Sequence, residues 1–110
     1  MIEIPLPLPV ARAITTLGRD ISLARRRRGM TQRSLAERIG SSLKTVQRLE
    51  KGDPRIPLHY IGRTLYVFGE LERLLHLLGT GEDVIGLTLM NERVPQRVRN
   101  AKKSAQSGSL

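Results

Sequence analysis

Apolar residues recur every three or four positions through residues 14–78, which is the spacing of amphipathic helices. A glycine follows each periodic stretch, and glycine adopts the left-handed conformation of a helix end without a steric penalty. Thr31 and Ser42 stand before two of these stretches and are suitable N-cap residues. The pattern predicts an all-α fold with five helices, over residues 14–28, 32–39, 43–51, 57–68 and 70–78.

The N-terminal segment has a different pattern, in which Pro5, Pro7 and Pro9 alternate with apolar residues. Proline fixes φ and lacks the amide proton that a helix interior needs. We therefore expect an extended arm over residues 1–13. The same spacing would also fit a ligand of the PxxP type.

The C-terminal segment changes to a period of two, which is typical of a strand. We expect residues 79–92 to hold a linker and one short β-strand. A lone strand leaves its backbone groups unpaired, so the same strand of a second subunit is the simplest partner. The apolar stripe of the fifth predicted helix belongs either to the core or to that dimer. Residues 93–110 are basic, then rich in Ser and Gly, and we expect partial disorder there. The residues expected in the dimer contact are Leu71, Leu74, Leu78, Ile85, Leu87 and Leu89.

Length and composition limit the classes of protein to consider. A chain of 110 residues is enough for one small domain. It has no cysteine, which excludes disulfides, thiolate zinc sites and a cysteine nucleophile. No apolar run approaches the roughly 20 residues that cross a bilayer, and the N-terminus lacks the pattern of a signal peptide. We expect a cytoplasmic protein with no membrane partner.

The formal net charge is +9, and it is unevenly distributed. Residues 1–57 carry a net charge of +7, residues 58–92 of −3 and residues 93–110 of +5. A concentration of positive charge predicts a polyanionic partner, and DNA or RNA fits better than an anionic membrane because no long basic amphipathic helix is evident.

The most informative motif spans residues 31–52 and follows the pattern T-Q-x-x-L-A-x-x-x-G-x-S-x-x-T-V-x-R-x-E-x-G. Two helices joined by a short turn need a small residue where they approach, here Ala36, and a glycine in the turn, here Gly40. The apolar anchors are Leu35, Ile39, Val46 and Leu49. The second helix then presents an outer face that suits base edges in the major groove, formed by Leu43, Lys44, Gln47 and Arg48.

This segment resembles the helix-turn-helix of the lambda-repressor/Cro (XRE-like) family, over roughly residues 14–78. The resemblance implies a five-helix DNA-binding domain in which Gln32 lies at the phosphate backbone and Arg25 forms a buried ion pair with Glu50. Leu43 and Gln47 depart from the residues common in relatives, which leaves the operator sequence open. The residues expected at the DNA are Gln32, Arg33, Ser42, Leu43, Lys44, Thr45, Gln47 and Arg48.

The arginine run 25–28 lies just before the turn into the second motif helix, where guanidinium groups can reach the DNA backbone. Its alternative interpretation is a solvated helix face. Lys44 and Arg48 could likewise be ordinary surface charges instead of DNA contacts. Leu43 could serve only in packing. The residues expected to contact phosphates are Arg26, Arg27, Thr31 and Lys51.

Read as a whole, the chain also resembles the HipB-like antitoxins, through L-G-R-D-I-S-L-A-R-R-R-R-G-M-T-Q, E-K-G-D-P and G-L-T-L-M-N-E-R-V-P-Q-R-V-R. This narrower resemblance implies a homodimer that binds a palindromic operator of its own operon. It also implies a HipA-like serine/threonine kinase toxin as partner, so that this chain is not itself the kinase.

Nothing in the sequence indicates catalysis, so we expect no enzyme, no cofactor and no metal. His59 and His76 lie on different predicted helices without neighbouring ligands, and the Gly79-Thr80-Gly81 segment lacks the remainder of a P-loop. RNA binding is disfavoured because the three aromatic residues fall within one predicted helix instead of on a stacking platform. Two alternatives to the antitoxin remain: a stand-alone repressor, and a protein-interaction adaptor that has kept the fold.

Overall fold

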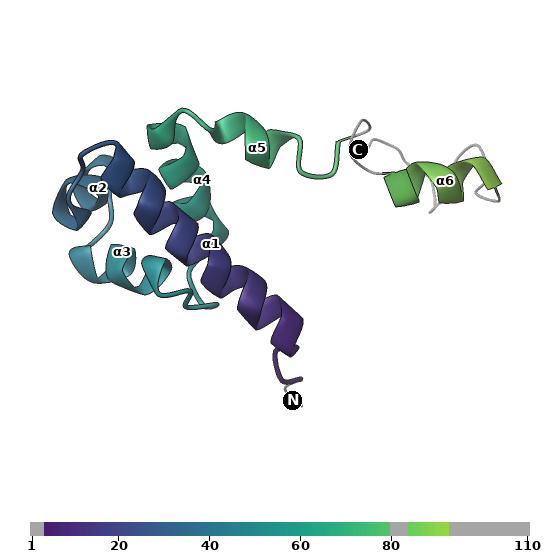
Figure 1. Ribbon diagram of the computed structural model, residues 1–110, viewed down its shortest axis with the longest axis horizontal. Helices are drawn as coiled ribbons and strands as arrows, with labels where there is room; N and C mark the ends of the chain where they lie inside the picture. The colour runs from purple at the N-terminus through teal and green to yellow at the C-terminus, as the bar shows by residue number, and fades with distance from the viewer. Residues whose placement is uncertain (1–3, 80–83, 93–110) are drawn as a thin grey trace, which may run out of the picture. The chain divides into compact units, whose positions relative to one another are not determined.

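The computed structural model describes residues 4–79 and 84–92. These residues form helices and no strand, which confirms the all-α class. The chain divides into two compact units, Met1–Leu74 and Leu75–Leu110, and each is described by itself. The helices are α1 (Leu8–Arg27), α2 (Gln32–Ile39), α3 (Leu43–Glu50), α4 (Leu58–Phe68), α5 (Leu71–Leu75) and α6 (Val84–Glu92), as labelled in Figure 1.

A small, mainly aliphatic core lies between the first four helices. α3 packs against both α1 and α2, and α2 also packs against α4. The N-terminal part of α1 extends beyond the other three helices (Figure 1). The buried core residues are Ile21, Leu35, Ala36, Ile39, Val46, Leu49 and Phe68.

The ends of α2 and α3 are fixed locally, as the sequence predicts. The Thr31 hydroxyl accepts a hydrogen bond from the Ser34 amide at 3.0 Å, which begins α2. Gly40 ends it with φ of 73°, a left-handed conformation that other residues rarely adopt. The Ser42 hydroxyl then accepts the Thr45 amide at 3.1 Å and begins α3. These caps fix the turn between the two helices.

The backbones of α1 and α3 lie unusually close together at Gly18. A Cβ atom added there would lie 2.7 Å from the carbonyl oxygen of Leu49 and 2.8 Å from that of Glu50. Both atoms belong to the backbone, so a side chain at this position would force the two helices apart. Gly18 therefore lets α1 lie directly against the C-terminal end of α3.

The predicted extended arm over residues 1–13 is wrong from Leu8 onward, because α1 begins there. Pro7 is the N-cap, and Pro9 lies in the first turn, where amide groups have no partner within the helix and a proline is tolerated. Residues 4–7 are not helical, and residues 1–3 lie outside the described part of the chain.

The predicted β-strand near residues 85–90 is also wrong, because α6 occupies this segment. The segment is apolar at nearly every position, so alternation and helical periodicity are both present in it. A helix satisfies its backbone groups within one segment, whereas a strand needs a second one. Ile85, Leu87 and Leu89 share one face of a strand, but successive members lie about 200° apart around a helix.

The fifth predicted helix, over residues 70–78, is shorter in the structure. α5 ends at Leu75, residues 76–78 form turns, and Gly79 donates a hydrogen bond to the His76 carbonyl at 3.1 Å. Leu78 therefore lies beyond the helix that was expected to carry it. The predicted basic tail over residues 93–110 lies outside the described residues, as does the linker part 80–83.

Candidate nucleic-acid interface

The two faces of α3 differ sharply in exposure. Val46 and Leu49 are buried in the core. Lys44, Gln47 and Lys51 are exposed on the opposite side, and the Arg48 side chain is 41% exposed. We call Lys44, Gln47, Arg48 and Lys51 the outer face of α3. Leu43, predicted to reach a base, is half-buried at the start of the helix, so that packing accounts for part of its surface.

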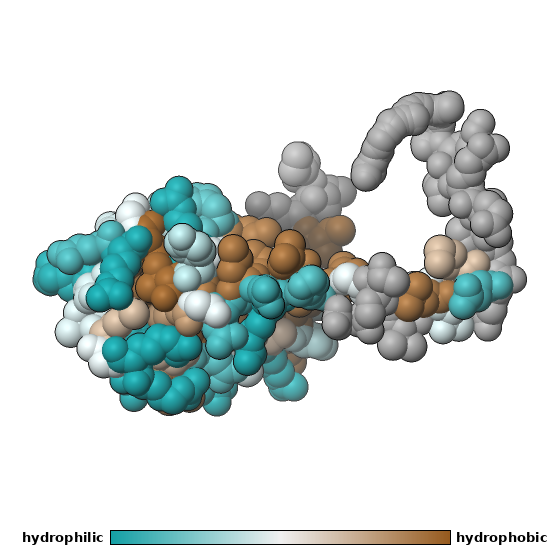
Figure 2. Space-filling view, turned by 90° about the horizontal axis from the view of Figure 1, so that it is seen from above, coloured by the Kyte–Doolittle hydropathy of each residue, from teal (hydrophilic) through white to brown (hydrophobic). Residues whose placement is uncertain are grey.

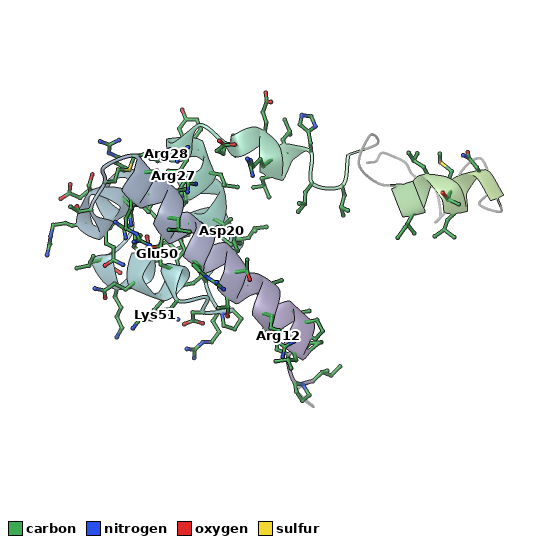
Figure 3. The ribbon with its side chains drawn as sticks, in the orientation of Figure 1. Arg12, Asp20, Arg27, Arg28, Glu50 and Lys51 are labelled. Atoms are coloured by element: carbon green, nitrogen blue, oxygen red, sulfur yellow. The ribbon has the colours of Figure 1, made fainter. Side chains whose placement is uncertain are left out.

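A buried ion pair ties the inner side of α3 to α1. Arg25 Nε lies 2.6 Å from Glu50 Oε2, and Arg25 Nη2 donates to Glu50 Oε1 at 3.0 Å. The remaining Arg25 nitrogen, Nη1, donates to the Met30 carbonyl at 2.7 Å. The side chains are only 10% and 6% exposed. Figure 3 shows Glu50 between α1 and α3, where the pair joins the two helices and the turn before α2.

Gln32 belongs to the same network, a role that sequence analysis missed. Its side-chain amide nitrogen donates to Glu50 Oε1 at 3.0 Å. Burial acts to raise the pKa of the Glu50 carboxyl, but the hydrogen bonds from Arg25 and Gln32 and the charge of Arg25 outweigh it and lower that pKa. The nitrogen of Gln32 is thus bound within the protein, and its oxygen, which accepts no hydrogen bond from the described residues, is the atom that remains for a ligand.

A second arginine–carboxylate pair lies at the C-terminal end of the outer face of α3. Arg48 Nε donates to Asp53 Oδ2 at 2.8 Å. The other carboxylate oxygen of Asp53 accepts the Arg55 amide at 2.9 Å and Arg55 Nε at 3.1 Å. The hydrogen bonds from Arg55 and then Arg48 hold the pKa of Asp53 well below its usual range. Asp53 and Arg55 were absent from the predicted site, although an Asp-Pro turn directly after the motif could have drawn attention to them.

A family model for a helix-turn-helix domain matches residues 16–86, which is more than half of the chain. The chain belongs to the helix-turn-helix family. The match supports the resemblance to the XRE-like group, while the HipB-like assignment stays a prediction. No curated protein and no solved structure matches the chain. A helix-turn-helix domain suggests a DNA-binding regulator. In known domains of this kind the second motif helix enters the major groove, and α3 is the helix at that position of the motif.

The four consecutive arginines of this helix-turn-helix domain have different surroundings. Arg25 is buried, whereas Arg26 and Arg27 are exposed. Arg28 donates to the Phe68 carbonyl at 3.1 Å, and its guanidinium carbon lies 4.7 Å from the centre of the Phe68 ring. Arg28 therefore joins α1 to the end of α4.

Arg27 points away from α3. At about 100° per residue, its side chain lies about 200° around α1 from Arg25, which faces Glu50. Figure 3 places Arg27 and Arg28 at the end of α1 and Lys51 beyond α3, well apart in that view. The structure thus does not bring Arg27 onto one surface with Lys51.

The remaining predicted DNA contacts lie at the starts of α2 and α3. Arg33 is exposed on α2, and Thr31 is exposed at its N-cap. The hydroxyls of Ser42 and Thr45 lie 3.0 Å apart, so both are engaged in the cap of α3. No group of three or more potential metal ligands occurs in residues 4–79 and 84–92. Among the same residues, no helix combines the length and the apolar character that a membrane span requires.

Proposed function

We propose that this protein is a sequence-specific DNA-binding transcriptional regulator that inserts α3 into the major groove. The observation that carries the proposal is the outer face of α3. Lys44, Gln47 and the C-cap Lys51 are exposed there and Arg48 is half-exposed, while core residues and the Arg25–Glu50 pair fix the other side of the helix. A major groove about 12 Å wide admits a single helix with its side chains.

The roles of the residues follow from their chemistry. Arg48 and Lys44 are suited to guanine, the Gln47 amide is suited to adenine, and the half-buried Leu43 offers an apolar surface for a thymine methyl group. Ser42 and Thr45 complete this surface. Phosphate contacts are assigned to Lys51 at the C-terminal end of α3, to Thr31, Gln32 and Arg33 at the start of α2, and to the exposed Arg26 near the end of α1. Arg27 faces another direction, so we expect no phosphate contact from it, and its substitution tests this expectation.

We further propose that the protein binds a two-fold symmetric operator as a homodimer. Leu58, Tyr66 and Leu71 are 66%, 72% and 42% exposed, and in Figure 2 apolar side chains gather on the face turned to the viewer. Exposed apolar area of this kind favours association. We assign the dimer contact to the exposed apolar side chains of α4 and α5, because the segment predicted to form a pairing strand is helical.

The narrower proposal is an autorepressing antitoxin of a HipA-like kinase toxin, acting in the cytoplasm as a binding protein and not as an enzyme. Its support is the sequence resemblance alone. A kinase-like reading frame beside the gene, together with a stable complex of the two purified proteins, would support this role. An isolated gene would favour the stand-alone repressor.

The deciding experiment is a fluorescence-anisotropy titration of the protein with a labelled duplex from upstream of its own gene and with a scrambled duplex, at two salt concentrations. We expect a preference of about 10³ or more for the first duplex. Arg48→Ala should reduce this preference, and Arg12→Ala, which removes the same side chain from an exposed position on α1 away from α3 in Figure 3, should not. Equal affinity for both duplexes would favour the interaction adaptor instead.

A further inference from the structure

We infer that Asp53 is a positioning residue, which holds the Arg48 guanidinium so that its two terminal nitrogens face the major groove and read a guanine. The inference rests on the proposed function and deepens it. It assigns the guanine contact to Arg48 instead of Lys44, and it adds a specificity-determining residue outside α3.

The first step is that Asp53 is itself held in place. Its amide donates to the Arg48 carbonyl at 3.0 Å, which attaches the turn to the end of α3. Its Oδ1 atom accepts the Arg55 amide two residues further along, at 2.9 Å. The side chain is only 12% exposed. The carboxylate is thus oriented by the backbone before it meets Arg48.

The second step concerns which nitrogens of Arg48 are engaged. Nε donates to Asp53 Oδ2 at 2.8 Å. Nη1 and Nη2 make no hydrogen bond to any residue in the described part of the chain. A guanine presents N7 and O6 as two adjacent acceptors in the major groove, and two nitrogens of one guanidinium match them in a bidentate contact. The hydrogen bond at Nε orients the plane of the guanidinium. It leaves Nη1 and Nη2, the two nitrogens that the bidentate contact with guanine uses.

The third step is the contrast with Lys44 on the same outer face. Lys44 is exposed and forms no hydrogen bond or ion pair within the described residues. Its ammonium is a point charge on a flexible stem, so it loses more conformational freedom when it binds one base edge. Arg48 has already lost part of that freedom in the folded protein, so the specificity for guanine resides mainly there.

The fourth step accounts for a carboxylate beside DNA. An uncompensated negative charge at this position would repel the phosphates. Arg55 Nη2 donates to Asp53 Oδ2 at 3.2 Å, and the Arg55 side chain is 79% exposed. Two guanidiniums therefore flank one carboxylate, so the group of three keeps a net positive charge toward the DNA.

The test uses Asp53→Asn. This change separates the contact of Asp53 with the Arg55 amide, which holds the turn, from its contact with Arg48 Nε, which positions the guanidinium. The asparagine oxygen can still accept the Arg55 amide and preserve the turn, whereas its NH₂ group would face Arg48 Nε as a second donor and break the positioning contact. Arg55→Ala is the matched control, because it removes the other guanidinium from Asp53 and leaves the Arg48 contact intact. Circular dichroism melts establish that each variant is folded.

The readout is selection from a pool of duplexes with randomised base pairs, using the full chain as wild type, Asp53→Asn, Arg55→Ala, Arg48→Ala and the double variant Asp53→Asn/Arg48→Ala. We expect Asp53→Asn to weaken the preference for G·C at one position of each half-site by about tenfold, the lower range for one bidentate contact. Arg48→Ala should abolish the preference at that position, and the double variant should match Arg48→Ala. Arg55→Ala should weaken binding to all sequences and leave the base preference unchanged.

Each other result has a definite meaning. A wild-type chain that selects no motif overturns the proposed function and this inference together. A wild-type motif that Asp53→Asn leaves unchanged overturns only the inference, as does a G·C preference lost with Lys44→Ala and kept with Arg48→Ala.

A second measurement covers an Asp53→Asn variant that does not fold. In the free wild-type protein, the Arg48 Nε–H resonance in ¹⁵N spectra should be shifted and protected from exchange relative to that of the exposed Arg12. An Arg48 resonance identical to that of Arg12 would exclude the positioning contact.

Discussion

The two arginine–carboxylate pairs at α3 share their chemistry. They differ in how exposed they are and in how many guanidinium nitrogens are bonded to acceptors in the described part of the protein. Arg25–Glu50 lies on the inner side, with exposed fractions of 10% and 6%, whereas Arg48–Asp53 lies at the outer face, with 41% and 12%. Arg25 directs all three of its nitrogens to acceptors inside the protein, at Glu50 and Met30. Among residues 4–79 and 84–92, Arg48 directs one nitrogen to an acceptor, at Asp53.

This difference separates a structural arginine from one available to a ligand. A buried guanidinium has lost its hydration and needs every hydrogen bond that the fold supplies. A half-exposed guanidinium with one fixed nitrogen keeps its orientation and still has donors to offer. Exposure and unpaired donors together therefore indicate function better than charge alone, and the predictions below test that distinction.

The largest effect should come from Arg25→Met, which leaves the Glu50 carboxylate buried without its main partner. Breaking one partner of a buried pair costs about 3 to 5 kcal/mol, so we expect a loss of that size in the free energy of unfolding. Urea denaturation followed by circular dichroism measures it. Arg12→Met, at an exposed position on α1, is the control and should change little. A loss no greater than that of the control would show that the inner pair is not structural.

The next effect should come from Arg48→Ala, which tests the outer pair. We expect a loss of about 1 to 3 kcal/mol in discrimination between the operator and a duplex with the guanine replaced. The free energy of unfolding should stay nearly unchanged, because the side chain is partly solvated. Anisotropy titrations and urea denaturation on the same preparation give both values. If Arg48→Ala lost stability and kept the base preference, Arg48 would have a structural role like that of Arg25.

A smaller effect should distinguish charges near α3 from charges elsewhere. Lys51→Ala removes one phosphate contact, so the slope of log K against log[salt] should fall in magnitude by about 0.9. Arg27→Ala makes the same change in net charge on the far side of α1 and should leave the slope unaltered. The slopes come from anisotropy titrations at four salt concentrations. If both substitutions reduced the slope by the same amount, phosphate contacts would extend around the end of α1. If neither did, Lys51 would not contact a phosphate.

The smallest effect concerns acid stability. The folded pKa of Glu50 lies below its ordinary value of 4.5, so its contribution is fully present above that value. The contribution is lost as pH falls through the lower, folded pKa. We expect the free energy of unfolding of the wild type to fall from pH 5 to about pH 3, and more steeply than that of Glu50→Gln. If the free energy of unfolding fell equally steeply with pH in both proteins, Glu50 would not contribute to the loss of stability in acid.

Much of the helix-turn-helix could be predicted because its signals are local. Thr31 and Ser42 act on amides three residues away, and Gly40 ends α2 through its own backbone conformation. Local signals failed in two segments. The apolar run of α6 fits both a helix and a strand, and the prolines at the start of α1 are unfavourable in a helix interior but tolerated in a first turn. In both segments the backbone hydrogen bonds within a helix outweighed the pattern.

The candidate site was predicted less completely than the fold. The sequence placed Lys44, Gln47 and Arg48 on one face, because helical spacing alone decides which residues share a face. It could not show that Gln32 donates to Glu50, or that Arg48 and Arg55 both donate to the carboxylate of Asp53. Those contacts depend on the path of the chain after α3 and on the angle between helices.

The sequence by itself determined the helix-turn-helix motif, its caps and the face of α3 that remains polar, since all of these depend on interactions within a few residues. Only the tertiary structure decided which arginines serve the fold and which remain available. Arg25 and Arg28 stand beside Arg26 and Arg27 in the chain, yet their partners Glu50 and Phe68 are 25 and 40 residues away. Identical side chains in one run acquire different roles because each points in a different direction around α1, and packing determines what it meets there.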